Sequence, residues 1–306
     1  MITQNIILGE GSRYPLKGIL TLPDNGQKVP AVVLVHGSGS SNMDEKVGKL
    51  TPFKDLAQGL AAHGIASIRY DKRSYAHPLK MMKDGCITVK EETIEDAILA
   101  TGLLREDPRI DPEKIFIIGH SMGAMLAPRI DAEGGCYRGL ILMAGTPRKL
   151  EEVMLGQTEE MLAAVSFPVR WILKKQTAKL KEAFASMYQL TDAQAKAKKM
   201  GNGTTLYYFK EMGEHPAADY LQKLQKPILI LQGGKDFQAK ADVDFAIYRQ
   251  LMQEKPNATF MLYENLNHAF VPAVYDTIDK AKQEYNIPRS MDETVIRHIA
   301  NWILSV

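Results

Sequence analysis

Short runs of apolar residues alternate with more polar stretches along the first half of the chain and again near its end. The clearest runs span residues 31–35, 115–118, 140–144, 228–231 and 258–263. Strands that are buried on both faces form continuous apolar runs, so these segments predict a parallel sheet. Two earlier segments, 5–8 and 16–22, predict a leading antiparallel hairpin. The alternation predicts an α/β fold with a mostly parallel central sheet flanked by helices.

This alternation stops between about Pro147 and Gln222, where the chain is rich in Met, Lys and Ala with helical spacing. We therefore predict a core formed by residues 1–146 and 223–306, with a helical cap inserted at 147–222. An insertion at this point would lie above the carboxyl edge of the sheet and could shape a pocket there. The candidate pocket residues are Met154, Met161, Phe167, Trp171, Met187, Tyr207 and Tyr208. Such side chains also commonly form a cap's own core, so both roles stay open.

One motif in the core suggests covalent chemistry. The sequence G-H-S-M-G at 119–123 follows an apolar run and precedes an apparent helix, which is the context of a nucleophile elbow. The strand-to-helix turn presents the central Ser121, and only small residues fit around it. We predict that Ser121 is a nucleophile.

A serine hydroxyl needs a histidine base and an acid that orients the base. In proteins with a nucleophile elbow, the acid and then the histidine follow the serine along the chain. Asp236 comes directly after the apolar run 228–231, and His268 lies in the loop after the run 258–263. We predict that Asp236 and His268 complete a triad with Ser121.

Other candidates for these two roles are less well placed. His298 also follows Asp236, but it falls in an amphipathic terminal helix. Asp242 and Asp244 lie at the start of a predicted helix, where acidic residues commonly cap the helix or complement its dipole.

An oxyanion site needs backbone amides close to the nucleophile. The sequence H-G-S-G at 36–39 leaves the predicted strand 31–35, and its glycines leave room for a substrate carbonyl. We predict that the amides of Ser38 and Met122 form this site. For His36 we predict a structural role through hydrogen bonds to neighbouring backbone.

These segments together resemble the α/β-hydrolase fold serine esterases, and especially a prokaryotic group with H-G-S-G after an early strand. The similarity spans nearly the whole chain, because 65–73 resembles the family's next strand and exit loop and 231–236 resembles its acid strand. Beyond H-G-S-G this chain reads S-S-N-M-D-E at 40–45, which keeps the group's acidic pair but lacks its proline.

The resemblance implies an α/β-hydrolase fold with the triad Ser121, Asp236 and His268. It also implies an oxyanion hole formed by the Ser38 and Met122 amides. It does not specify the substrate.

The amino-acid composition limits the classes of binding partner and the cellular location that we expect. The 306 residues carry a net charge of +2 without a concentrated basic tract, which argues against nucleic acid or an anionic membrane as a partner. Cys86 and Cys136 are too few for a disulfide framework, and the first residues do not resemble a signal peptide. We therefore expect a cytoplasmic enzyme. The sequence contains no cluster of histidines and cysteines that suggests a metal site, and it leaves open a homo-oligomer.

The most specific hypothesis is a serine hydrolase that cleaves small carboxylic esters through an acyl-enzyme, without a cofactor. A thioesterase or small-peptide peptidase could use the same triad, because fold and catalytic residues do not select the leaving group. A third alternative is a non-catalytic protein of this fold that binds a small molecule.

Overall fold

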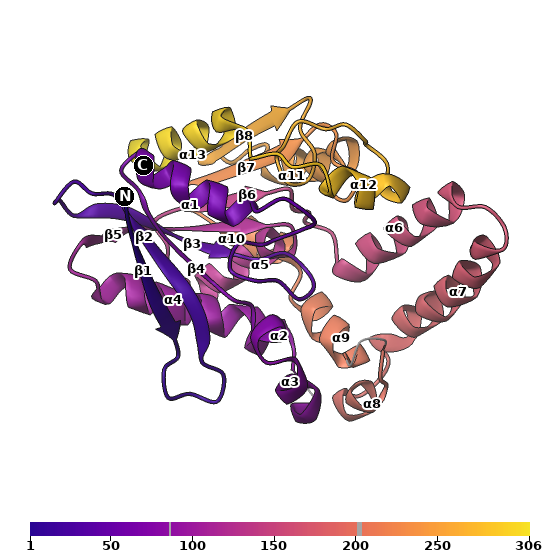
Figure 1. Ribbon diagram of the computed structural model, residues 1–306. Coiled ribbons are helices and arrows are strands. Elements are labelled where there is room, and N and C mark those ends of the chain that lie inside the picture. Colours follow the sequence, from indigo (N-terminus) through magenta and orange to yellow (C-terminus); the bar gives the residue numbers. More distant parts are fainter. Residues whose placement is uncertain (86, 201–203) are drawn as a thin grey trace.

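A single mixed sheet forms the centre of the computed structural model, which describes residues 1–85, 87–200 and 204–306 (Figure 1). Within these residues eight strands are joined in the order β1-β2-β4-β3-β5-β6-β7-β8. The strands are β1 (Ile2–Leu8), β2 (Leu16–Leu22), β3 (Val29–Val35), β4 (Ala66–Tyr70), β5 (Ile110–His120), β6 (Leu140–Met143), β7 (Ile228–Gly233) and β8 (Ala258–Tyr263). The strands β1 and β2 pair antiparallel, as do β2 and β4, and the other neighbouring pairs are parallel. The predicted α/β fold and its leading hairpin are confirmed.

Helices cover both faces of the sheet. The helices are α1 (Pro52–Ala62), α2 (Arg73–Ala76), α3 (Pro78–Asp84), α4 (Glu95–Glu106), α5 (Met122–Ile130), α6 (Leu150–Ala164), α7 (Val169–Met187), α8 (Asp192–Ala197), α9 (Leu206–Glu214), α10 (Ala217–Lys223), α11 (Ala246–Met252), α12 (Ala281–Tyr285) and α13 (Glu293–Ser305). Short helical turns precede α4 at Lys90–Ile94 and α11 at Ala241–Phe245, follow α5 at Asp131–Gly135 and precede α12 at Ile278–Lys280. In the part of the chain that is described, no helix has both the length and the apolar composition needed to cross a bilayer.

The alternation of side chains along the strands divides the core into two layers. In β3, Val32 and Leu34 pack with α1 and α13, whereas Val33 and Val35 pack with α4 and α5 on the other face. Both sets are fully buried. Burial on both faces explains why the central strands are apolar at nearly every position.

The chain between β6 and β7 forms helices joined by loops in its described residues, with an isolated β-bridge between Lys199 and Thr205. It forms α6 to α10, and Figure 1 shows α6 and α7 side by side, extending away from the sheet. The last of these helices, α10, packs against α5 and α11 of the layer that covers the sheet.

The parallel strands align the loops that follow them. Val35 at the end of β3 pairs with Gly119 near the end of β5, and Gly233 at the end of β7 pairs with Tyr263 at the end of β8. The loops after these four strands therefore meet at one edge of the sheet.

Candidate active site

Ser121 occupies a sharp turn between β5 and α5. Its backbone has φ 54° and ψ −118°, a conformation that non-glycine residues rarely adopt. A Cβ on Gly119 would lie 2.2 Å from the carbonyl oxygen of Gly123, and a Cβ on Gly123 would lie 2.1 Å from that of Val35. The strand, tight turn and helix predicted from the G-H-S-M-G motif are present, and the two glycines are what the turn requires.

His268 and Asp236 form a buried hydrogen-bonded pair. His268 Nδ1 lies 2.8 Å from Asp236 Oδ2, and the Asp236 side chain is fully buried. A turn after β7, in which the Asp236 amide donates to the carbonyl oxygen of Gly233, places the carboxylate. Its Oδ1 accepts hydrogen bonds from the amides of Gln238 and Ala239 at 2.7 and 3.0 Å. A carboxylate fixed in this way can hold an imidazole in one orientation and tautomer.

The loop that carries His268 is held by the residue before it. Asn267 Oδ1 accepts hydrogen bonds from the amides of Ala269 and Val271 at 2.9 and 3.3 Å. Asn267 Nδ2 donates to Glu284 Oε1 at 2.7 Å, and both side chains are fully buried. The His268 backbone is therefore positioned independently of the imidazole's own hydrogen bond.

The alternative acid and base candidates lie apart from this pair. Asp244 accepts a hydrogen bond from the Thr146 hydroxyl at 2.6 Å, and Asp242 is exposed to solvent. His298 on α13 shares a 3.0 Å hydrogen bond with the Tyr263 hydroxyl. Of these acids, Asp236 is the one that contacts His268.

Two backbone amides beside Ser121 are available to developing negative charge. Ser38, in the loop after β3, and Met122, the first residue of α5, line the same cavity as Ser121. Neither amide donates a hydrogen bond within the described residues. The first amides of a helix have no acceptor within the helix, which explains the free N–H of Met122. The neighbouring Gly37 amide is occupied, because it donates to Glu45 Oε1 at 2.7 Å.

His36 lies in the core behind this loop. Its side chain is 1% exposed and packs against the rings of Phe53 and Tyr70, and its Nε2 donates to the carbonyl oxygen of Asn42 at 3.1 Å. Burial lowers the pKa of His36 to about 4, so the ring is neutral at pH 7. The predicted hydrogen bond to neighbouring backbone is confirmed.

A buried ion pair that was not predicted from the sequence lies next to Ser121. His120 Nδ1 lies 2.9 Å from Glu45 Oε2, and His120 Nε2 donates to the carbonyl oxygen of His268 at 2.9 Å. Burial would lower the pKa of His120, but the Glu45 carboxylate outweighs burial and the pKa is raised. Burial alone would raise the pKa of Glu45, but His120 opposes this effect, and the pKa of Glu45 is lowered. Each group therefore favours the charged form of the other. The acidic pair at 44–45 was the only signal in the sequence.

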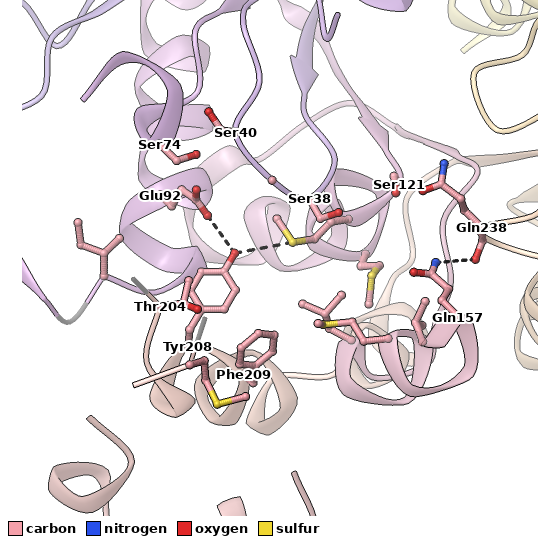
Figure 2. Close-up of a pocket in the computed structure, with 18 of the residues that line it drawn as sticks. Ser38, Ser40, Ser74, Glu92, Ser121, Gln157, Thr204, Tyr208, Phe209 and Gln238 are labelled. Carbon is pink, nitrogen blue, oxygen red and sulfur yellow. Dashed lines mark hydrogen bonds between the residues drawn. The ribbon is translucent and has the colours of Figure 1, made fainter. Parts of the chain in front are cut away.

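A cavity of about 840 Å³ lies against these residues. Ser121, His268, Ser38 and Met122 all line it. In Figure 2 Ser121 lies on the same side of the cavity as Gln157 of α6 and Gln238 of the acid loop. Gln157 Nε2 donates to the carbonyl oxygen of Gln238 at 3.0 Å, which joins α6 to the loop that carries Asp236. Helices α6 and α9 thus form walls of the cavity beside Ser121.

Of the seven candidate pocket residues, two line the cavity. Met154 and Tyr208 line the cavity. The other five candidates do not, namely Met161, Phe167, Trp171, Met187 and Tyr207. Phe167 and Trp171 are 81% and 54% exposed at the outer end of the α6–α7 pair, and Met187 is fully buried in the packing between helices. Helical spacing identifies residues on one face of a helix, but it does not reveal what that face contacts.

The described residues contain no group of three or more His, Cys, Asp and Glu side chains placed to hold a metal ion. Cys136 is a free, exposed thiol, and Cys86 lies outside the described residues.

The fold and the serine at its sharp turn define an α/β-hydrolase. Residues 26–272 match the family described as "Serine aminopeptidase, S33", and the chain belongs to this family. A curated relative, Esterase EstD from Thermotoga maritima, is 32% identical over 291 residues, which cover 94% of this chain. The chain spans 65% of the length of that relative.

Solved structures show the same architecture. Est1E from Butyrivibrio proteoclasticus aligns with a TM-score of 0.60 at 16% identity, over 98% of each chain. The Pyrococcus furiosus esterase Pf2001 aligns with a TM-score of 0.59 at 16% identity, over 99% of this chain and 90% of the other. These similarities concern the fold.

Proposed function

We propose that the protein is a serine hydrolase that cleaves small carboxylic esters through an acyl-enzyme intermediate. The observation that carries the proposal is that Ser121 and His268 line one cavity while Asp236 binds the other nitrogen of the imidazole. The name of the relative from Thermotoga maritima, an esterase, supports the same reaction.

Each residue has a defined role in this reaction. His268 takes the proton from the Ser121 hydroxyl as its oxygen attacks the ester carbonyl carbon. The amides of Ser38 and Met122 donate to the resulting oxyanion, and Asp236 stabilises the imidazolium. His268 then gives its proton to the departing alcohol, and a water molecule activated by the same imidazole releases the acid from Ser121.

We also propose the domain division predicted from the sequence, with residues 147–222 as a cap on the core formed by 1–146 and 223–306. The contribution of α6 and α9 to the cavity walls supports this role, because helices placed there exclude water from an ester bound at Ser121. Membership of the H-G-S-G group, a cytoplasmic location and a homo-oligomer stay predictions from the sequence.

An aminopeptidase, the activity in the family's description, has to bind a free ammonium group. Glu92 is the one acidic side chain among the described residues that line the cavity. Its Oε2 lies 3.8 Å from Lys72 Nζ, so its charge is already balanced. Ester substrates, which carry no ammonium group, fit this site better than peptides with a free amino terminus.

The experiment is labelling with a fluorophosphonate, read by mass spectrometry of the intact protein, together with turnover of p-nitrophenyl esters of increasing acyl length. The wild type is expected to gain one adduct and to hydrolyse short esters, and Ser121→Ala is expected to do neither while remaining folded. Hydrolysis at the wild-type rate by Ser121→Ala would disprove the proposal. Faster turnover of amino acid p-nitroanilides than of esters would assign the site to peptides instead.

A further inference from the structure

The cavity has a polar region distinct from the residues that the ester reaction uses. Its side-chain oxygens include those of Ser38, Ser40, Ser74, Glu92, Thr205 and Tyr208. In Figure 2 Glu92, Ser40 and Ser74 lie on the opposite side of the cavity from Gln157 and Gln238, and Ser38 lies between them. This region comes from α9, the loop after β3, α2 and the turn before α4.

A buried acid and a tyrosine form the centre of this region. The Tyr208 hydroxyl donates to Glu92 Oε2 at 2.9 Å, and the two residues are 9% and 6% exposed. The same hydroxyl lies 3.8 Å from the sulfur of Met122, whose amide belongs to the proposed oxyanion site. The polar region therefore begins at the side chain of Met122, the residue after Ser121.

Two further hydroxyls in this region make no hydrogen bond to the described residues. They are Ser74 Oγ and Thr205 Oγ1, and both atoms are buried. Thr205 as a whole is 4% exposed, and both residues line the cavity. Buried polar groups are normally hydrogen-bonded, and an unpaired one is unfavourable. A ligand that can donate and accept hydrogen bonds would satisfy both hydroxyls.

The charges around this region cancel. Glu92 is balanced by Lys72, which also donates to the carbonyl oxygen of Gly37 at 2.9 Å. Glu45 is balanced by His120. The region contributes no net charge that would select an ion, but it offers both donors and acceptors, the combination that recognises a neutral hydroxyl group.

We propose that the polar region binds neutral hydroxyl groups of the substrate, so that the preferred substrates are esters with a free hydroxyl a few bonds from the carbonyl. The proposal rests on the proposed esterase function. The hydroxyl can belong to the alcohol, as in a partial ester of a polyol, or to the acyl group, as in a hydroxy acid. In either case a neutral hydroxyl group of the ester lies in the polar region around Glu92 and Tyr208.

Binding to Ser121→Ala tests the proposal without turnover. Isothermal titration would compare two matched pairs: glycerol 1-monobutyrate with propyl butyrate, and methyl 3-hydroxybutyrate with methyl butyrate. We expect the hydroxylated member of at least one pair to bind at least about tenfold more tightly, because a site built for a hydroxyl rejects the analogue that lacks it. The first pair reports a hydroxyl on the alcohol, and the second reports a hydroxyl on the acyl group.

The two unpaired hydroxyls supply variants that keep the fold. Ser74→Ala and Thr205→Val, each combined with Ser121→Ala, remove a hydroxyl that bonds to no described residue, so the melting temperature is expected not to fall. Each should reduce the preference for the hydroxylated ligand at least about threefold. Tyr208→Phe, which also breaks the bond to Glu92, should reduce it further. Tyr220→Phe removes a tyrosine hydroxyl outside the cavity and serves as the matched control, with the preference unchanged.

Equal binding within both pairs would overturn the proposal, and so would preferences that survive all three cavity variants. These results would leave the esterase function intact if the wild type hydrolyses the plain esters through Ser121. If no ester is hydrolysed, the proposed function fails, and the binding preference of Ser121→Ala still decides whether the polar region recognises hydroxyl groups.

Discussion

Glu45 and His120 form a buried ion pair, 2.9 Å between Oε2 and Nδ1, that connects three loops of the site. Glu45 comes from the loop after β3 and also accepts the amide of Gly37. His120 directly precedes Ser121 and donates to the backbone of His268. A protonated imidazole can form an ion pair with a carboxylate beside one nitrogen while the other nitrogen donates to a carbonyl. The pair thereby holds the oxyanion loop, the nucleophile turn and the base loop together.

Removing the charge of Glu45 is expected to lower both the stability of the protein and its catalytic efficiency. In Glu45→Gln a buried imidazolium loses its counterion, which should lower the free energy of unfolding by about 3 to 5 kcal/mol. Displacement of the oxyanion loop should reduce kcat/KM for p-nitrophenyl butyrate by roughly 10-fold or more. Urea denaturation and steady-state kinetics measure these effects. Glu113→Gln, at an exposed position on β5, is the control and should change neither. A stable, fully active Glu45→Gln would show that the pair does not position the site.

The same pair makes stability depend on pH in a defined window. The pKa of His120 is raised above its ordinary 6.5, so its contribution is complete below pH 6.5 and is lost as the pH rises through the folded-state value. The pKa of Glu45 is lowered below its ordinary 4.5, so its contribution is complete above pH 4.5 and is lost as the pH falls.

The pair should therefore stabilise most between pH 4.5 and 6.5. The measurement is the difference in unfolding free energy between the wild type and the double variant Glu45→Gln/His120→Gln across the pH range. We expect this difference to shrink on both sides of the window. A difference that grows steadily with pH would mean that His120 is neutral.

Asp236→Asn tests which acid orients His268. The amide presents a donor group to the imidazole or leaves it in the wrong tautomer, so kcat should fall roughly 10³- to 10⁴-fold. The hydrogen bonds from the amides of Gln238 and Ala239 can persist to the remaining oxygen, so the protein should stay folded. Ester turnover and circular dichroism report the two properties. The exposed Asp242→Asn is the matched control, and loss of activity in that variant alone would mean that the acid was assigned incorrectly.

The sequence was sufficient for the sheet and for the placement of Ser121, Asp236 and His268. Each of these residues follows an apolar run, and parallel strands bring such positions to one edge, so chain order alone implied their proximity. The structure confirms the contact between His268 and Asp236. Local rules were enough because each element obeys its own pattern.

The sequence was not sufficient for contacts between loops or for the cavity. Glu45 and His120 meet because the fold brings their loops together, and no local pattern identifies such a partner. The aromatic residues Phe167 and Trp171 were candidates for the pocket or for the cap's own core, and both are exposed instead. No local pattern indicates the contact of Glu92, because its partner Tyr208 lies on a helix far along the chain.

Gly123 and Gly156 both lie in helices, yet substitution by alanine should have opposite effects. A Cβ on Gly123 would lie 2.1 Å from the carbonyl oxygen of Val35 and 2.7 Å from that of His36, so α5 must move away from β3. Gly123→Ala should lower the unfolding free energy by about 3 kcal/mol and abolish most ester turnover, because α5 carries the Met122 amide. A Cβ on Gly156 of α6 meets nothing within 4 Å, and alanine there should stabilise the helix by up to about 1 kcal/mol. Urea denaturation of the two variants measures both, and equal stabilities would show that α5 and β3 do not pack as closely as this turn requires.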